Sequence, residues 1–472
     1  LEFRRVLFRS VAYVAMPHPP ILIPEVGHGE ERKIKSTYDA CERIGREIAD
    51  LKPEVIIMVT PHGTMFSDAI AVSFEPFIAG SLKQFGAQEV SMSFEIDMDL
   101  TQEIMVRAEK INIPIVRATN STLKQYGREY ELDHGCIVPL YFVFNKYKLF
   151  KFVHITYGGI NPIELYKFGK LIEEAVQKSN KNVVFIASGD LSHHLKDEGP
   201  YEYNPYGEKF DKRIIRLLKN GDVASIFNMD AEMIQKAGEC GLRSYYIMLG
   251  AMDGYDIVGE LLSYEGTFGV GYAVMEFKLK KGDRDILSEI TKEKEKKYNM
   301  RLKNEDVYVR LARESLTYYL AKGNYMDVPG YVTCEMINNK RGVFVSLKKF
   351  GVLRGCIGTI FPTSENIAEE IMQNAVSAGE GDPRFNNVIL EELNDIVFSV
   401  DILTKPIKTS KEELNPKKYG VIVRGGQNSG LLLPDLEGID TIDKQINIVL
   451  NKAGILINDD YSIEKFEVIR HI

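Results

Sequence analysis

The chain has 472 residues, of which 44% are hydrophobic and 27% charged, and its formal net charge is −8. This length exceeds that of one ordinary domain and predicts two, each able to bury a core. The negative charge argues against a nucleic-acid partner, because phosphate binding requires a basic surface. No apolar run reaches the roughly 20 residues that cross a bilayer, so we expect no membrane segment and no membrane partner.

The ends and cysteines of the chain give two further expectations. Residues 1–10, LEFRRVLFRS, join abruptly to a strand-like segment and are interpreted as non-native. Their three arginines interrupt any apolar core of a signal peptide. The cysteines are scattered without a C-x-x-C pair, which excludes a disulfide framework or a zinc ribbon: Cys41, Cys136, Cys240, Cys334 and Cys356. A reducing cytoplasm is therefore the expected location.

Short apolar runs alternate with longer amphipathic stretches between residues 11 and 277. Because the strand-like runs are apolar on both faces, we predict a largely parallel sheet covered by helices, an α/β fold. The Gly-rich segment 264–277 is expected to supply the closing strands. The predicted strands are 11–15, 55–60, 183–188 and one within KFVHITYGG, and the predicted helices are 30–52, 162–178, 207–219 and 241–252.

Residues 278–305 are highly charged and nearly free of aromatic side chains, which predicts a solvated helix or linker between domains. A second domain is expected over 306–472. Apolar residues from Tyr308 to Leu320 follow helical spacing, and helices grouped among strands favour a smaller α+β domain. Its predicted strands are 342–349, 353–360, 396–404, 419–426 and 429–436, with a further helix at 364–378.

Histidines are concentrated in the first half of the chain, where seven of the eight lie before residue 195. Three share one arrangement: His18 follows the strand VAYVA, His62 follows VIIMVT, and His193 follows VVFIAS. The carboxyl ends of parallel strands meet at one edge of a sheet, where ligands bind in open α/β folds. Imidazole is the commonest transition-metal ligand in proteins. The pattern therefore predicts a metal site at this edge.

Other histidines lack this arrangement and are interpreted as structural or surface residues. His154 lies inside a predicted strand, His28 lies in a polar turn, and His471 lies in the second domain.

Several ordered motifs over residues 11–277 resemble the LigB superfamily of class III extradiol dioxygenases and its Memo-like relatives. They are MPHPPILIPEVG, VTPHGTMF, ELDHGCIVPL, ASGDLSHHL and GPYEYNPYGEKFD. The resemblance implies an α/β/α sandwich and a metal, Fe(II) above all, with Zn or Cu as alternatives. It implies His18 and His62 as ligands, and His134 and His193 as acid–base or oxygen-handling residues.

The third ligand is left open between two adjacent residues. Dioxygenases of the superfamily place a Glu in the segment that matches KAGECGLRSYY, whereas Memo-like proteins place a Cys in a CG motif. Glu239 would complete the two-histidine, one-carboxylate triad of non-haem iron oxygenases. Cys240, which the CG match favours slightly, would suit Zn or Cu as readily as Fe. Arg243 nearby is either a partner for an anionic substrate or a surface cation.

Motifs over residues 306–472 resemble the AMME chromosomal region family, in bacteria AmmeMemoRadiSam system protein A. They are LRGCIGTI, EGDPRF, YGVIV, SGLLLPDL and NKAGI. The resemblance implies association with a radical SAM protein as a partner. Arg354 is a candidate for binding an anionic group, and Cys356 is a candidate nucleophile or a buried residue of a tight turn.

The first hypothesis for function is a metal-dependent oxidoreductase-like domain that acts on an aromatic diol with O2, as the resemblance implies. In that case His193 is the general base on a substrate hydroxyl, because its pKa lies naturally near the operating pH. Two alternatives are a zinc metallohydrolase and a non-catalytic metal-binding or scaffold component of a modification system. The Tyr- and Pro-rich segment GPYEYNPYG is either an aromatic wall of the site or a rigid surface loop.

Overall fold

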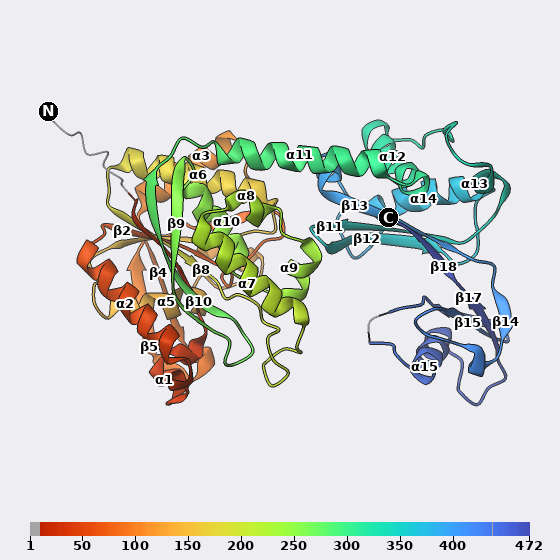
Figure 1. Ribbon diagram of the computed structural model, residues 1–472, viewed down its shortest axis with the longest axis horizontal. Helices are drawn as coiled ribbons and strands as arrows, with labels where there is room; N and C mark the ends of the chain where they lie inside the picture. Colours follow the sequence, from red (N-terminus) through yellow and green to blue (C-terminus); the bar gives the residue numbers. More distant parts are fainter. Residues whose placement is uncertain (1–9, 437) are drawn as a thin grey trace. The chain divides into compact units, whose positions relative to one another are not determined.

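The computed structural model describes residues 10–436 and 438–472. Residues 1–9 of the segment interpreted as non-native lie outside the described residues, and strand β1 begins at Ser10. The chain divides into two compact units, with the boundary between Lys294 and Glu295. That boundary falls within helix α11 (Ile286–Asn304), labelled in Figure 1. The predicted linker at 278–305 is therefore helical over most of its length.

The first unit is built on one large sheet of mostly parallel central strands. The strand order is β6-β3-β7-β2-β8-β1-β10-β9, with antiparallel pairing at β3–β7, β1–β10 and β10–β9. The strands are β1 (Ser10–Met16), β2 (Val55–Thr60), β3 (Ile70–Ser73), β6 (Ile115–Ala118), β7 (Lys151–Thr156), β8 (Val183–Ser188), β9 (Tyr255–Glu265) and β10 (Tyr272–Lys281).

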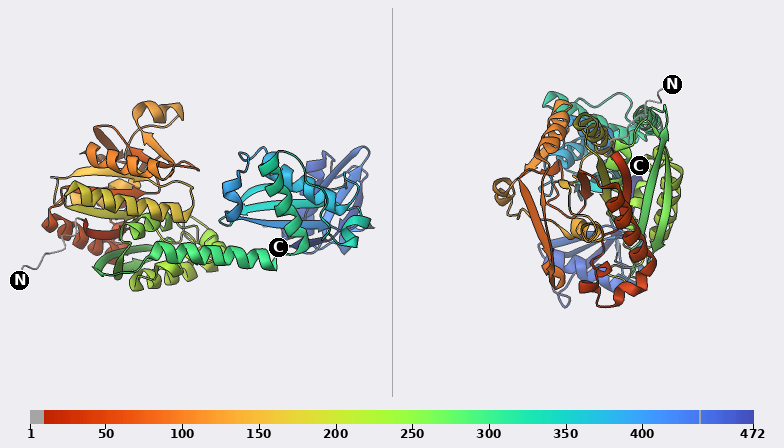
Figure 2. Two further views of the ribbon diagram at one scale, coloured as in Figure 1. Left: turned by 90° about the horizontal axis from the view of Figure 1, so that it is seen from above. Right: turned by 90° about the vertical axis from the view of Figure 1, so that its left-hand side faces the viewer.

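Two hydrophobic cores lie on opposite faces of this sheet, as the helices on both sides show in Figure 2. Strands β2 and β8 are buried along their whole length because both faces are covered. One face packs against α3 (Met98–Lys110), α6 (Pro162–Ser179), α7 (Pro205–Asn220), α9 (Ala231–Ala237) and α10 (Leu242–Ala251). The other packs against α2 (Lys35–Leu51), α5 (His134–Phe144) and the hairpin β4 (Phe77–Leu82) and β5 (Ala87–Glu95). Short helices complete the unit: α1 (Pro24–Gly27), α4 (Asn120–Gln125) and α8 (Val223–Phe227).

The three strands that precede the predicted metal-site histidines are neighbours in the sheet. Strand β8 pairs in parallel with β1 on one side and with β2 on the other. Met16 is in register with Ser188, and Val59 is in register with Ala187, so the three strands end at the same level. The predicted α/β fold with a mostly parallel sheet is confirmed, and its carboxyl edge lies where the sequence pattern places it.

Some element boundaries differ from the sequence prediction. Helix α2 begins at Lys35 because a 3₁₀ helix, Glu30–Ile34, precedes it. Strand β9 starts at Tyr255, well before the expected Gly-rich segment, and β10 continues past residue 277 to Lys281. These two strands form the outer antiparallel edge of the sheet, where half-exposed positions weaken the apolar pattern that the prediction relied on.

The second unit is an antiparallel α+β domain, as the sequence predicts. In its described part, two four-stranded sheets have the orders β12-β11-β13-β18 and β14-β17-β15-β16. Its helices are α12 (Val307–Lys322), α13 (Cys334–Asn338), α14 (Ile367–Glu380) and α15 (Ile442–Ala453). Its strands are β11 (Val343–Lys349), β12 (Val352–Thr359), β13 (Ile396–Leu403), β14 (Ile407–Thr409), β15 (Gly420–Gly425), β16 (Asn428–Leu432), β17 (Ser462–Phe466) and β18 (Val468–His471).

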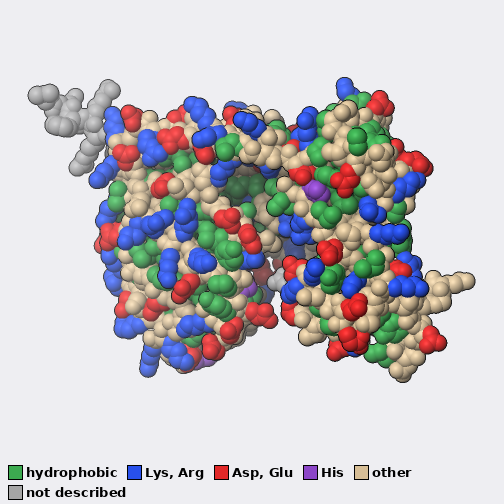
Figure 3. All heavy atoms as spheres, turned by 45° about the vertical axis from the view of Figure 1, so that its right-hand side comes forward, with side chains coloured by type: hydrophobic (Ala, Val, Ile, Leu, Met, Phe, Trp, Pro, Cys, Tyr) green, Lys and Arg blue, Asp and Glu red, His purple; other side chains and the backbone are tan. Residues whose placement is uncertain are grey.

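The surface of the molecule carries charges of both signs. On the face drawn in Figure 3, acidic and basic side chains are interspersed, without a broad area of one charge. Within residues 10–436 and 438–472, every helix is too short or too polar to cross a bilayer.

Helices α6 and α10 approach closely through glycines. A Cβ atom built on Gly250 would lie 1.9 Å from the carbonyl oxygen of Tyr166, and one built on Gly169 would lie 1.9 Å from that of Ile247. We expect Gly250→Ala to lower the free energy of unfolding by about 2–3 kcal/mol, because backbone must move to relieve the overlap. Urea denaturation followed by circular dichroism measures this change.

Gly330→Ala is the matched control, since a Cβ atom there meets nothing within 4 Å. Equal stabilities of the two variants would contradict the close packing of α6 and α10.

Candidate metal centre

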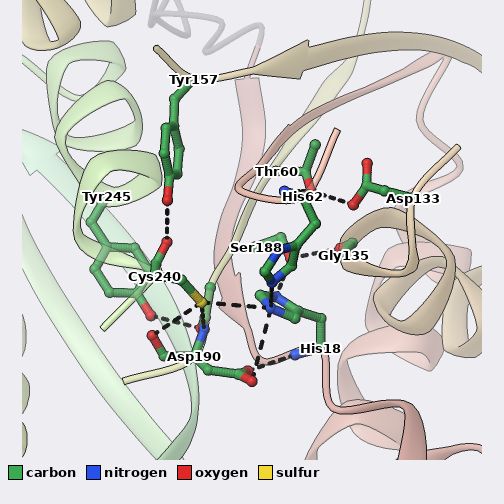
Figure 4. A network of polar contacts seen from close by, with 11 residues as sticks. His18, Thr60, His62, Asp133, Gly135, Tyr157, Ser188, Asp190, Cys240 and Tyr245 are labelled. Carbon is green, nitrogen blue, oxygen red and sulfur yellow. Dashed lines mark hydrogen bonds and ion pairs between the residues drawn. The ribbon is translucent and has the colours of Figure 1, made fainter. Parts of the chain in front are cut away.

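Three side chains converge at the carboxyl edge of the large sheet. The Nε2 atoms of His18 and His62 lie 2.9 Å apart, and the Sγ atom of Cys240 lies 3.6 Å from His18 Nε2 (Figure 4). All three donor atoms lie within 4.8 Å of one another. His18 is buried, Cys240 is half-buried and His62 is exposed, so the cluster opens to solvent on the His62 side.

These distances fit three ligands of one transition-metal ion. Nitrogen ligands at about 2.1 Å from an ion lie about 3.0 Å apart when they subtend a right angle. A nitrogen and a sulfur at tetrahedral positions lie about 3.6 Å apart. The observed separations of 2.9 and 3.6 Å lie within the range that pairs of ligands on one ion span. The donor set therefore fits a metal ion with little rearrangement.

The hydrogen bonds of His18 present its Nε2 atom to the cluster. Ser188 Oγ donates its one proton to the carbonyl oxygen of Gly135, at 2.6 Å. It must then accept the hydrogen bond from His18 Nδ1, at 2.9 Å. Nδ1 consequently carries the proton and Nε2 keeps its lone pair, the state that a metal ligand needs. Burial and the neighbouring His62 also hold the pKa of His18 well below its usual range, so this imidazole is neutral.

Close backbone packing positions Cys240. A Cβ atom on Gly189 would lie 2.0 Å from the Cα atom of Gly241, so the loop after β8 and the loop before α10 require glycine at this contact. The hydroxyl of Tyr157 donates to the Cys240 carbonyl oxygen at 2.9 Å. The backbone N–H of Asp190 donates to the Cys240 thiol at 3.3 Å. The thiol is thereby fixed towards His18.

Glu239, the alternative third ligand, serves a different purpose. Its Oε2 atom accepts a hydrogen bond from the backbone N–H of Leu242 at 2.6 Å, at the first residue of α10. A carboxylate at this position satisfies a free N–H of the helix N-terminus. Burial raises the pKa of Glu239 to about 7. The carboxylate lies outside the cluster of donor atoms, which contains Cys240.

Asp190 is part of this site, although it was not among the residues predicted from the sequence. Its Oδ1 atom accepts from the backbone N–H of His18 at 2.8 Å, and its Oδ2 atom lies 3.8 Å from His18 Nε2. Burial raises the pKa of Asp190 to about 6. A signal was present in the sequence, because Asp190 follows β8 just as His18 follows β1 and His62 follows β2.

His134 and His193 line the same site. The His134 ring stacks on His62 with centroids 4.3 Å apart, and Phe85 contacts it edge-on at 5.2 Å. The His193 ring stacks on Tyr201, from the Tyr-rich segment, at 5.2 Å. Burial and the neighbouring imidazoles of His18 and His62 lower the pKa of His134 to about 3. Burial also lowers the pKa of His193, so both rings are neutral bases at neutral pH.

Arg243 forms hydrogen bonds with the backbone of the same unit. Its guanidinium donates to the carbonyl oxygens of Gly158 and Ile160, at 3.0 and 2.9 Å, and so ties α10 to the loop after β7. One nitrogen of the guanidinium is therefore held by backbone carbonyl oxygens, which gives Arg243 a structural role at the N-terminal turn of α10.

Arg354 and Cys356, the two candidate residues of the second unit, both form contacts within that unit. The guanidinium of Arg354 binds both carboxylate oxygens of Glu392, at 3.1 and 2.9 Å. Cys356 is half-buried in β12, where the hydroxyl of Ser346 donates to its sulfur at 3.2 Å. The anionic partner of Arg354 is thus a residue of the same unit.

Comparison with known families agrees with this architecture. The family described as the catalytic LigB subunit of aromatic ring-opening dioxygenase matches residues 12–275. The chain belongs to this family. The AMMECR1 family matches residues 309–471, so a LigB domain is joined to an AMMECR1 domain in one chain.

Relatives of this protein are known in bacteria and archaea. A protein of Clostridium acetobutylicum is 53% identical over 97% of this chain and 98% of its own length. A Thermotoga maritima protein is 46% identical over 35% of this chain and 98% of its own length. Among solved structures, an uncharacterized protein of Pyrococcus horikoshii is 31% identical, covering 34% of this chain and 88% of its own, with a TM-score of 0.32.

Asp211 of α7 supports the loop that carries His193. It accepts from the backbone N–H of Ser192 at 2.8 Å and from the hydroxyl of Tyr264 at 2.7 Å. Burial raises the pKa of this carboxyl to about 7. The folded state therefore favours the protonated form, and this stabilisation is complete below the unfolded pKa of about 3.9 and lost as pH rises to 7.

We expect the stability of the wild type, relative to Asp211→Asn, to fall by roughly 2–4 kcal/mol between pH 4 and pH 7. Urea denaturation across this range, with chelator present, measures the difference. Because Asn also changes a hydrogen bond, the two proteins can differ in stability at every pH. Only the change of this stability difference with pH reports on the pKa of Asp211. A difference that does not vary with pH would contradict the raised pKa.

Proposed function

We propose that the first unit is a metal-dependent oxidoreductase similar to class III extradiol dioxygenases, with one ion held by His18, His62 and Cys240. The observation that supports this most directly is the convergence of the three donor atoms within 4.8 Å at the carboxyl edge of the sheet. We take Fe(II) as the functional ion, since the matching family is described as the catalytic subunit of an aromatic ring-opening dioxygenase. Bound at three protein ligands, Fe(II) would offer open positions to substrate oxygens and to O2.

In this proposal His193 removes a proton from a substrate hydroxyl. A neutral imidazole with a lowered pKa can accept a proton at its free ring nitrogen near neutral pH. The carboxylate of Asp190 acts to raise the pKa of His193, so it would stabilise the imidazolium that forms. His134, which stacks on His62, would hydrogen-bond a substrate oxygen or O2 in this proposal.

Aromatic side chains favour a small planar substrate. Phe85 contacts His134, and Tyr201 contacts His193, so each acid–base candidate has an aromatic neighbour. Phe85 and Tyr201 are both exposed, which leaves their ring surfaces available to a ligand. An aromatic diol is therefore the proposed substrate class.

One observation favours a second candidate function. Cys240 supplies a thiolate in place of the carboxylate of non-haem iron oxygenases, and a two-histidine, one-cysteine set suits zinc as well as iron. With zinc, the same residues would support hydrolysis, with His193 as the base that accepts a proton from water.

Metal analysis of anaerobically purified protein tests the site. We expect about one equivalent of metal to depend on this cluster, and His18→Ala/His62→Ala to lose it, because one thiolate alone binds weakly. His28→Asn is a matched control: His28 is an exposed histidine with a φ of 48°, a conformation that Asn tolerates.

Iron in this site, together with O2 consumption on added catechols, would support the oxygenase proposal. Zinc that the double variant loses would favour hydrolysis. Equal metal content in the wild type and the double variant would contradict the site.

The role of His193 can be separated from metal binding. We expect His193→Asn to keep the metal of the wild type while turnover of a catechol falls about 10²- to 10⁴-fold, since a general base is removed. Steady-state O2 consumption and metal analysis of the same sample measure the two effects. Unchanged turnover would exclude His193 as the base.

A further inference from the structure

A second group of metal-ligating side chains lies in the first unit, beside the centre described above. Asp133 precedes α5, Cys136 lies in its first turn, and His154 lies in strand β7. Their donor atoms lie within 4.8 Å of one another. The side chains of Asp133 and His154 are 8% and 5% exposed, and Cys136 is fully buried.

Two donor atoms of this group have no hydrogen-bond partner among the described residues: Asp133 Oδ2 and His154 Nε2. They face each other at 3.5 Å, which is too long for a good hydrogen bond. The other polar atom of each side chain is occupied. Asp133 Oδ1 accepts from Thr60 Oγ1 at 2.6 Å, and His154 Nδ1 lies 2.7 Å from Ser73 Oγ. Buried polar atoms without a partner are costly, so a missing partner is indicated.

The contact between Ser73 Oγ and His154 Nδ1 is compatible with the tautomer that a metal ligand requires. If His154 Nδ1 carries the proton and donates it to Ser73, its Nε2 atom keeps a lone pair directed at Asp133. In that tautomer two acceptors face each other at 3.5 Å, and a cation between them would remove their repulsion. Oxygen and nitrogen ligands of one tetrahedral zinc ion lie about 3.4 Å apart, close to the observed distance.

Charge and ligand chemistry identify the class of cation. A carboxylate and a thiolate with a neutral imidazole neutralise a divalent ion, so no net charge is buried. Oxygen, sulfur and nitrogen donors together suit Zn²⁺, whereas Ca²⁺ and Mg²⁺ require oxygen ligands. We propose that Asp133, Cys136 and His154 form a second, structural zinc site, separate from the centre at His18, His62 and Cys240.

The position of this site gives it a structural consequence. An ion there would join the N-terminal turn of α5 to strand β7, across Asp133 and His154. That turn begins with His134, which lines the first centre, and Asp133 binds Thr60 at the end of β2, two residues before His62. The second ion would thus fix the elements that carry two residues of the first centre. The inference does not depend on the proposed function, because it involves neither His18 nor Cys240.

Zinc stoichiometry tests the inference on the full chain. Protein is stripped with chelator, reconstituted with zinc and freed of excess metal by gel filtration. We expect about two equivalents in the wild type, about one in His18→Ala/His62→Ala, and about one in Cys136→Ser and in His154→Gln. Cys41→Ser is the matched control, since Cys41 is equally buried in the same core but lies outside the group, and it should keep two.

Absorption by bound cobalt(II) tests the same site without replacing the buried Cys136. Thiolate-to-cobalt absorption should persist in Cys240→Ser, where Cys136 remains, and should be lost when His154→Gln is added. One zinc equivalent in the wild type that His18→Ala/His62→Ala loses would overturn the inference. Retention of the second equivalent in both Cys136→Ser and His154→Gln would also overturn it. One equivalent that only Cys136→Ser and His154→Gln lose would support this site while contradicting the first centre.

Discussion

Parallel pairing of three adjacent strands is the constraint on which the candidate centre depends. Strand β8 pairs with β1 and β2, and all three end at one level. The loop after each strand begins with a polar residue at this edge. His18, His62 and Asp190 therefore lie close together although they are far apart in the sequence. Parallel strands of this kind are usually buried on both faces, and here helices on both sides of the sheet supply that burial.

Buried polar groups then set the chemistry of this edge. Ser188 fixes the tautomer of His18, and the glycine contact between Gly189 and Gly241 brings Cys240 to the cluster. Burial keeps the imidazoles neutral, which suits both metal ligation and proton acceptance. The same low-polarity environment makes unpartnered atoms costly, and this is why the facing atoms of Asp133 and His154 indicate a missing cation.

The two domains differ in how their family motifs are used. In the LigB domain, motif residues converge on an open cluster with one exposed member, His62. In the AMMECR1 domain, Arg354 forms an ion pair with Glu392, and the backbone N–H of Cys356 donates to Asp382. The LRGCIG motif therefore contributes to the packing of strand β12 and its neighbours, whereas the histidine motifs of the first domain present free donor atoms.

The sequence by itself determined the fold class, the positions of several main strands and the edge of the sheet at which His18 and His62 were expected. It could do so because apolar periodicity and strand-end position are local properties of the chain. It left the third ligand open between Glu239 and Cys240, with a slight preference for Cys240 from the CG match, since adjacent residues share most local signals. Only the tertiary structure separated them: Glu239 caps α10, whereas the thiol of Cys240 faces His18. His154 was interpreted as an ordinary strand residue, because its contact with Asp133 joins elements that no local pattern relates.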